Sequence, residues 1–123
     1  MDYAKLIKDT LAPLGIPRAE TIYTGTKPVY IVFSEYFEGG AASAANKVVE
    51  REHSFMINIY QKFGDTSVDL NTLKEQTINL LETAGFYNVT AQNQTGLETV
   101  NGAIQYNRWL IDCSYTENLQ AFQ

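Results

Sequence analysis

The chain has 123 residues, of which 45% are hydrophobic and 12% aromatic; this is enough for one core without disulfides or metal, and it excludes a disordered chain. The formal net charge of −5 argues against a protein whose main partner is a phosphate backbone, because such proteins depend on clustered Lys and Arg. Cys113 is the single cysteine, which excludes an intrachain disulfide and fits a reducing cytoplasm. No apolar run approaches the roughly 20 residues that span a bilayer, so no membrane partner is expected.

The first segment predicts a short amphipathic helix over Asp2–Leu14, with its apolar residues on one stripe and Asp2 as the N-cap. Pro13, Gly15 and Pro17 end it. A short edge strand is expected around Thr21–Tyr23.

Two strong strands are predicted at Val29–Tyr36 and Val48–Lys62, both with apolar residues on two faces, which is typical of strands inside a sheet. The intervening Phe37–Lys47 contains Gly39 and Gly40 and is expected to be a long loop. Such a loop is either a surface segment without a role or an assembly contact.

A second helix is predicted over Leu70–Ala84, with Asp69 as its N-cap and Gly85 at its end. Its buried stripe is expected to consist of Leu70, Leu73, Leu80, Leu81 and Ala84.

The remaining segments predict a strand at Phe86–Gln92, a polar loop at Asn93–Gly102 and a last strand at Ile104–Tyr115. The order is helix, two strands, helix, two strands. We therefore expect a single α+β domain over residues 1–123, with a mainly antiparallel sheet of about four strands and two helices packed on one face.

No catalytic, cofactor-binding or metal site is predicted. His53 is the only histidine and is interpreted as an ordinary polar residue at the start of a strand, while Cys113 lies among apolar neighbours and is expected to be a buried, inert thiol. The charged Glu50–Glu52 run fits a solvated strand entrance or the neighbourhood of another subunit. The eight tyrosines fit half-buried strand positions and interfaces better than a nucleic-acid platform, which needs a basic groove. We do not expect an enzyme.

The ordered segments together resemble the small tail-terminator or tail-completion proteins of long-tailed bacteriophages and prophages. The similarity covers nearly the whole chain as a series of features rather than one strict motif. These features are Leu14–Pro17 after the first helix, Pro28–Phe33, Ala44–Asn46, Phe55–Lys62, Leu81–Phe86 and Tyr106–Trp109.

The resemblance implies a structural virion protein without cofactors that forms a ring, commonly a hexamer, on the head-proximal end of the tail tube. Such a ring stops tube growth and presents the surface that joins the head, so its partners are further copies of itself, the tail tube protein and a head-completion protein. DNA passes through the opening without specific binding. The expected location is the host cytoplasm during assembly and then the head–tail junction of the virion. From loop position, Phe37, Lys47 and Arg51 are the predicted interface residues.

Two other functions stay open at this point. The first is a head–tail adaptor or head-completion protein, which has similar size and α+β character. The second is a small regulatory domain that binds a small molecule or peptide between sheet and loops.

Overall fold

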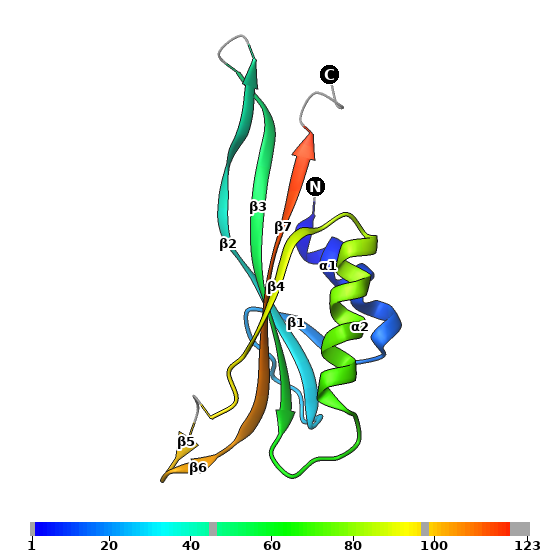
Figure 1. Cartoon of the computed structure of the whole chain (residues 1–123), viewed down its shortest axis with the longest axis vertical. Helices are drawn as coiled ribbons and strands as arrows, with labels where there is room; N and C mark the ends of the chain where they lie inside the picture. The colour runs from blue at the N-terminus through cyan, green and yellow to red at the C-terminus, as the bar shows by residue number, and fades with distance from the viewer. Residues whose placement is uncertain (1, 45–46, 97–98, 119–123) are drawn as a thin grey trace.

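The computed structural model describes residues 2–44, 47–96 and 99–118, with the side chains at 41–44 and 47–49 outside that description. A five-stranded sheet forms the centre, and both helices pack against one of its faces (Figure 1). The elements in chain order are α1 (Tyr3–Leu11), a 3-10 turn (Ala12–Leu14), β1 (Arg18–Glu20), β2 (Val29–Ala44), β3 (Lys47–Lys62), α2 (Leu70–Thr83), β4 (Tyr87–Asn93), β5 (Thr99–Val100), β6 (Ala103–Ile104) and β7 (Tyr106–Asn118).

The expected α+β class, with a mainly antiparallel sheet and two helices, is confirmed, but the strand count and order are corrected. The described sheet has the order β1-β2-β3-β7-β4, and only the β1–β2 pair is parallel. The fifth strand of the sheet is β1, the expected edge strand, which forms at Arg18–Glu20 instead of Thr21–Tyr23. Thr21 has a left-handed φ of 67°, which ends the strand at the residue where we expected it to begin.

Both helices begin where their capping residues predict. The Asp2 carboxylate accepts a hydrogen bond from the Lys5 backbone N–H at 3.0 Å, and the Asp69 carboxylate accepts one from the Asn71 N–H at 3.1 Å. The first helix ends earlier than expected, at Leu11, because the chain tightens into the 3-10 turn before Gly15, whose φ is 68°.

The buried side of α2 differs slightly from the predicted stripe. Leu73 and Leu81 are buried, but Ala84 is exposed and Thr77 takes a core position. The Thr77 hydroxyl donates to the Leu73 carbonyl oxygen at 2.7 Å, so its burial leaves no unsatisfied polar group.

The core lies between the helices and the face of the sheet that they cover. Alternation along β2, β3 and β7 places one apolar row from each strand on this face, as the predicted faces of the strands require. The fully or nearly fully buried side chains are Ile7, Leu11, Val29, Ile31, Phe33, Phe55, Ile57, Ile59, Leu73, Leu81, Phe86, Ile111 and Cys113.

The prediction of a loop at Phe37–Lys47 is wrong for the described residues, because the chain continues β2 as far as Ala44 and begins β3 at Lys47, so that the two central strands form one long hairpin (Figure 1). Residues 45–46 of the predicted loop lie outside the described residues. Pairing extends from Val29 with Gln61 to Ala44 with Lys47. The hairpin absorbs the small residues through register shifts between Glu35 and Phe37 and again after Gly40. Backbone pairing with β3 therefore outweighs the low strand propensity of Gly and Ala.

The second predicted loop, Asn93–Gly102, also contains regular structure. Thr99 pairs with Ile104 and Val100 with Ala103, and the two residues between them, Asn101 and Gly102, both have positive φ (52° and 79°). This is the backbone that an Asn-Gly hairpin turn requires. The flanking strands run one to three residues beyond their predicted ends, to Asn93 and Asn118.

Candidate assembly surfaces and a histidine–carboxylate cluster

The structure places the three predicted interface residues on the β2–β3 hairpin but not on one surface. Phe37 pairs with Ser54 and Arg51 with Gly40, so strand alternation directs their side chains to opposite faces of the hairpin. The backbone of Lys47 pairs with Ala44, and its side chain lies outside the described part of the structure.

Phe37 is 47% exposed, and its ring covers a glycine. A Cβ added to Gly39 would lie 2.7 Å from the Phe37 Cζ atom, so the ring occupies the space of the missing side chain. An aromatic ring over a strand glycine supplies packing that the glycine lacks. The exposed outer surface of that ring is an apolar contact available to a partner.

Arg51 has a partner within the chain. Its Nη1 atom lies 3.3 Å from Glu38 Oε1, and both side chains are substantially exposed. A surface pair of this kind contributes little to stability, so Arg51 can exchange its partner at an interface at small cost.

The two edges of the sheet are open over long stretches. Among the described residues, β1 pairs with β2 only at Ile31–Phe33, and no strand covers the outer side of β2 from Ser34 to Ala44. At the opposite side, β4 is the last strand of the sheet. Unpaired backbone N–H and C=O groups at such edges are templates for pairing with another chain.

The face of the sheet turned away from the helices carries a cluster of tyrosines. Tyr23 stacks on Tyr30 with ring centroids 4.3 Å apart, and Tyr30 stacks on Tyr60 at 5.1 Å, with Tyr106 edge-on to both Tyr30 and Tyr60. Sequence reasoning assigned the tyrosines to strand positions and interfaces without predicting this cluster, because only the tertiary structure brings these four together.

Basic groups lie beside this tyrosine cluster. The Arg108 guanidinium lies 5.0 Å from the Tyr60 ring centre and donates to Asn58 Oδ1 at 2.7 Å, and Lys27 and Lys62 line a neighbouring hollow. The tyrosine rings nevertheless stack on one another, so their faces are poorly placed to stack on nucleic-acid bases. We interpret the cluster as packing for the open face of the sheet.

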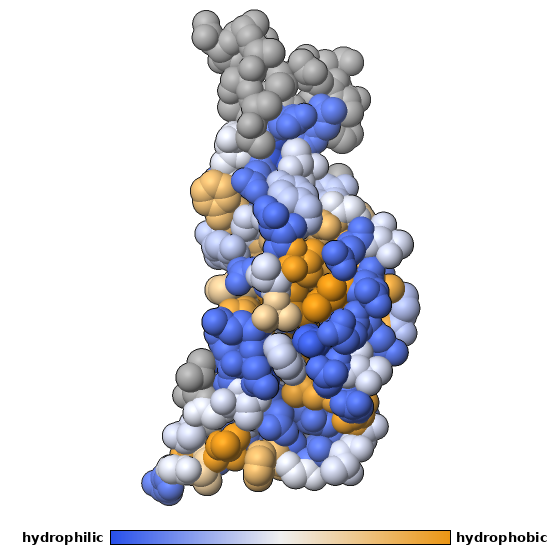
Figure 2. All heavy atoms as spheres, in the orientation of Figure 1, coloured by the Kyte–Doolittle hydropathy of each residue, from blue (hydrophilic) through white to orange (hydrophobic). Residues whose placement is uncertain are grey.

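Apolar groups also reach the surface at the opposite end from the β2–β3 hairpin. Val100 and Ile104 of the β5–β6 hairpin are 58% and 36% exposed, and Figure 2 shows apolar atoms gathered at this tip. Phe63, at the end of β3, is 58% exposed. Among the described residues, exposed apolar side chains therefore lie on the β2–β3 hairpin at Phe37 and also at the β5–β6 tip (Figure 2).

His53 is buried, contrary to the interpretation of it as an ordinary residue at a strand entrance. Only 3% of it is exposed, because it lies in the middle of β3 and its ring packs against Tyr3 of α1 at 3.9 Å between ring centres. Its Nδ1 atom is 3.0 Å from Glu35 Oε2, and its Nε2 atom is 3.4 Å from Glu117 Oε1. Both ring nitrogens therefore face carboxylates.

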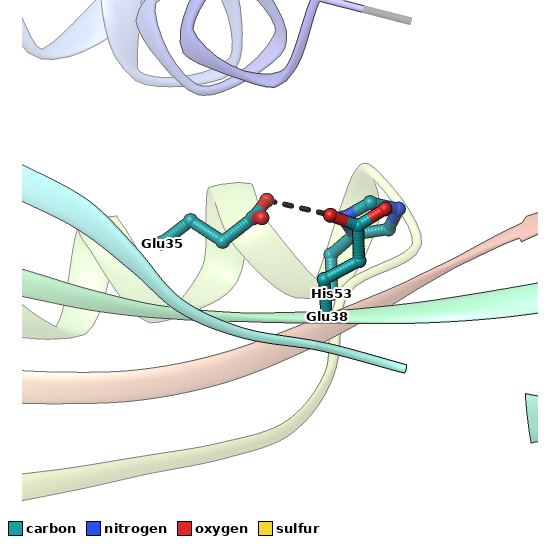
Figure 3. A group of neighbouring side chains, drawn as sticks. All are labelled: Glu35, Glu38 and His53. Atoms are coloured by element: carbon teal, nitrogen blue, oxygen red, sulfur yellow. Dashed lines mark hydrogen bonds and ion pairs between the residues drawn. The ribbon is translucent and has the colours of Figure 1, made fainter. Parts of the chain in front are cut away.

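A third carboxylate joins this group. Glu35, Glu38 and His53 offer ligand atoms that all lie within 4.8 Å of one another, and Figure 3 shows their side chains converging on the side of the sheet that faces α1. We refer to Glu35, Glu38, His53 and Glu117 as the His53 cluster.

The bulge in β2 creates this arrangement. In regular alternation, residues 35 and 38 would point to opposite faces, but the register shift between Glu35 and Phe37 returns Glu38 to the face of Glu35. Glu38 then stands directly across from His53, and Glu35 stands diagonally. No sequence motif marks the cluster, because its members lie on three strands and converge only through the bulge in β2.

The N-terminus of α1 borders the cluster. Burial, reinforced by the Glu117 carboxylate, raises the pKa of the Tyr3 hydroxyl well above its usual value. A hollow of about 400 Å³ opens beside Glu35, and its other carboxylates are Asp2 and Glu20. The surroundings of the cluster are thus acidic on the solvent side.

Cys113 is buried, as expected. It is 1% exposed on the covered face of β7, and burial raises the pKa of its thiol to about 12.

Comparison of the chain with protein-family models and with curated proteins finds no match. In the described part of the chain, neither helix has the length and apolar character to cross a membrane.

Proposed function

We propose that the protein is a structural subunit of a long-tailed phage, which assembles into a ring on the head-proximal end of the tail tube, stops tube growth and provides the head-joining surface. The observation that carries the proposal is the pair of open sheet edges, on β2 beyond Phe33 and on β4. The order of segments that resembles tail terminators supplies the particular role.

A closed ring requires head-to-tail contact between two different patches on each subunit. The β2 and β4 edges are on opposite sides of the sheet and therefore meet this requirement, since β2 of one subunit can face β4 of the next. The two strands run in opposite directions within the sheet, so such a contact would continue the sheet in antiparallel fashion. Phe37 and Arg51, on the two faces of the hairpin, would contact neighbours or the tube.

The acidic character supports passage of DNA through such a ring. With a net charge of −5, a ring of these subunits has little tendency to retain a phosphate backbone.

The genetic test is negative-stain electron microscopy of lysates from the parent phage with this gene disrupted. Overlong tails beside unjoined full heads are expected. Tails of normal length that fail to join heads would instead assign the protein to the adaptor ring, our second candidate. Normal infectious particles would refute both assembly functions and favour a regulatory binding domain.

The biochemical test compares two substitutions on the β2–β3 hairpin with one substitution of an exposed phenylalanine outside it. Phe37→Glu and Arg51→Glu should each reduce ring formation, measured by light scattering after size-exclusion chromatography with purified tube protein present. Phe63→Glu is the matched control, because Phe63 is at least as exposed as Phe37 (58% against 47%) but lies just after the far end of β3. Equal disruption by Phe63→Glu, or normal assembly of both hairpin variants, would remove the hairpin from the interface.

A further inference from the structure

We infer that the His53 cluster binds one divalent transition-metal ion of the Zn²⁺ type, which ties the bulge of β2 to β3. The ligands are His53 Nδ1 and the carboxylates of Glu35 and Glu38, whose ligand atoms already lie within 4.8 Å of one another. Ligand atoms that are about 2.0–2.2 Å from a zinc ion are separated by roughly 3–4 Å, so small side-chain movements complete the site.

The hydrogen bonds of His53 supply an independent reason for a cation here. A neutral imidazole has one N–H, but both nitrogens of His53 lie near carboxylate oxygens, at 3.0 and 3.4 Å. With one N–H, one nitrogen lone pair must face a carboxylate. An imidazolium, with two N–H groups, would remove this conflict, and so would a metal ion at Nδ1. With the metal ion bound, Nε2–H donates to Glu117, and a histidine ligand held by a carboxylate in this way is the usual arrangement at metal sites.

Burial makes the histidine a preorganised ligand, while its carboxylate partners stay accessible. The imidazole is 3% exposed and packs against the Tyr3 ring at 3.9 Å between ring centres, whereas the Glu35 and Glu38 side chains are 32% and 47% exposed. The hollow beside Glu35, with Asp2 and Glu20 on its lining, places further negative charge next to the site and so favours a cation there.

The nitrogen ligand decides which ion fits. Ca²⁺ and Mg²⁺ take oxygen ligands, whereas Zn²⁺ accepts imidazole and carboxylate together. Arg51 competes for this site, because its guanidinium lies 3.3 Å from Glu38 Oε1. Removing the Arg51 charge should therefore tighten metal binding.

The test is a titration of the EDTA-stripped full chain with ZnCl₂ by isothermal titration calorimetry, with Co²⁺ absorption as a probe of ligand geometry. We expect one Zn²⁺ per chain, a loss of at least about tenfold in affinity in Glu35→Gln and in Glu38→Gln, and tighter binding in Arg51→Met. Glu75→Gln is the matched control, because it makes the same change at an exposed glutamate on α2. This variant should bind Zn²⁺ as tightly as the unmodified chain does.

His53→Gln should abolish binding, and the two exposed glutamate variants keep the test decisive if loss of the buried histidine unfolds the chain. Absence of stoichiometric Zn²⁺ binding, equal affinity in the Glu35→Gln and Glu75→Gln variants, or equally tight Mg²⁺ binding would overturn the assignment. The measurement needs no assembled ring, so its outcome is independent of the proposed function.

Discussion

The two halves of the β2–β3 hairpin share the same strands but differ in what stabilises them. From Val29 to Phe33 and from Phe55 to Gln61, the strands are covered by helices and flanked by β1 and β7. Beyond Glu35, β2 has only β3 beside it among the described residues, and its side chains are glutamates, small residues and exposed aromatics. The covered half is stabilised by apolar burial. The exposed half, beyond Glu35, is stabilised chiefly by backbone pairing between β2 and β3.

The exposed half of the hairpin is the better candidate for a functional surface in a domain where no catalytic site is predicted. The part of a hairpin that extends beyond the hydrophobic core exposes unpaired backbone groups and apolar side chains. These groups add little to the stability of the domain and can instead contact other subunits. The His53 cluster lies at the boundary between the two halves, where the bulge changes the facing of β2.

The largest contrast is expected in thiol chemistry. A rise in the Cys113 pKa from 9.0 to about 12 lowers the thiolate fraction at pH 8 about a thousandfold, so alkylation should be slower by that factor in the folded than in the unfolded chain. Because the folded pKa is the higher one, this group favours folding below about pH 9 and loses that contribution as the pH rises toward 12. Iodoacetamide labelling followed by mass spectrometry checks it; rapid labelling without denaturant would contradict a sealed core.

Truncation in the covered half should cost the most stability. Ile57 is fully buried between sheet and helices, so Ile57→Ala should lower the free energy of unfolding by about 3 kcal/mol. Urea denaturation followed by circular dichroism measures it. A loss below about 1 kcal/mol would mean that the core is loosely packed.

Removal of the α2 cap should have a moderate effect. Asp69→Ala removes the hydrogen bonds to the Asn71 N–H and the Thr72 hydroxyl and should cost about 1 kcal/mol, since the helix covers the same core. Asp69→Asn retains a capping oxygen and is the control. Equal losses in both variants would show that charge, not capping, matters.

The smallest effect is expected in the exposed half. Phe37→Ala should change the free energy of unfolding by less than about 0.5 kcal/mol, because the ring is half-exposed and covers only Gly39. The same denaturation assay applies, and Gly39→Ala should be tolerated better in the Phe37→Ala background than alone. A Phe37→Ala loss that approached that of Ile57→Ala would erase the proposed distinction between the halves.

Local sequence signals predicted much of the scaffold. Asp2 and Asp69 mark both helix starts, Gly85 with a φ of 98° follows the second helix, and the alternation in β3 and β7 grouped the side chains that share a face. These features depend on interactions within a few residues or on a strict period of two, which a single sequence carries directly.

Sequence patterns alone were therefore sufficient for the α+β class, the helices, the central strands and the burial of Cys113. Long-range packing was needed to establish that residues 37–44 are strand, that Phe37 and Arg51 face opposite ways, and that His53 meets Glu35, Glu38 and Glu117. The reason is physical: strand pairing between distant segments overrides the weak propensities of glycine and alanine, and one bulge changes which face a residue occupies.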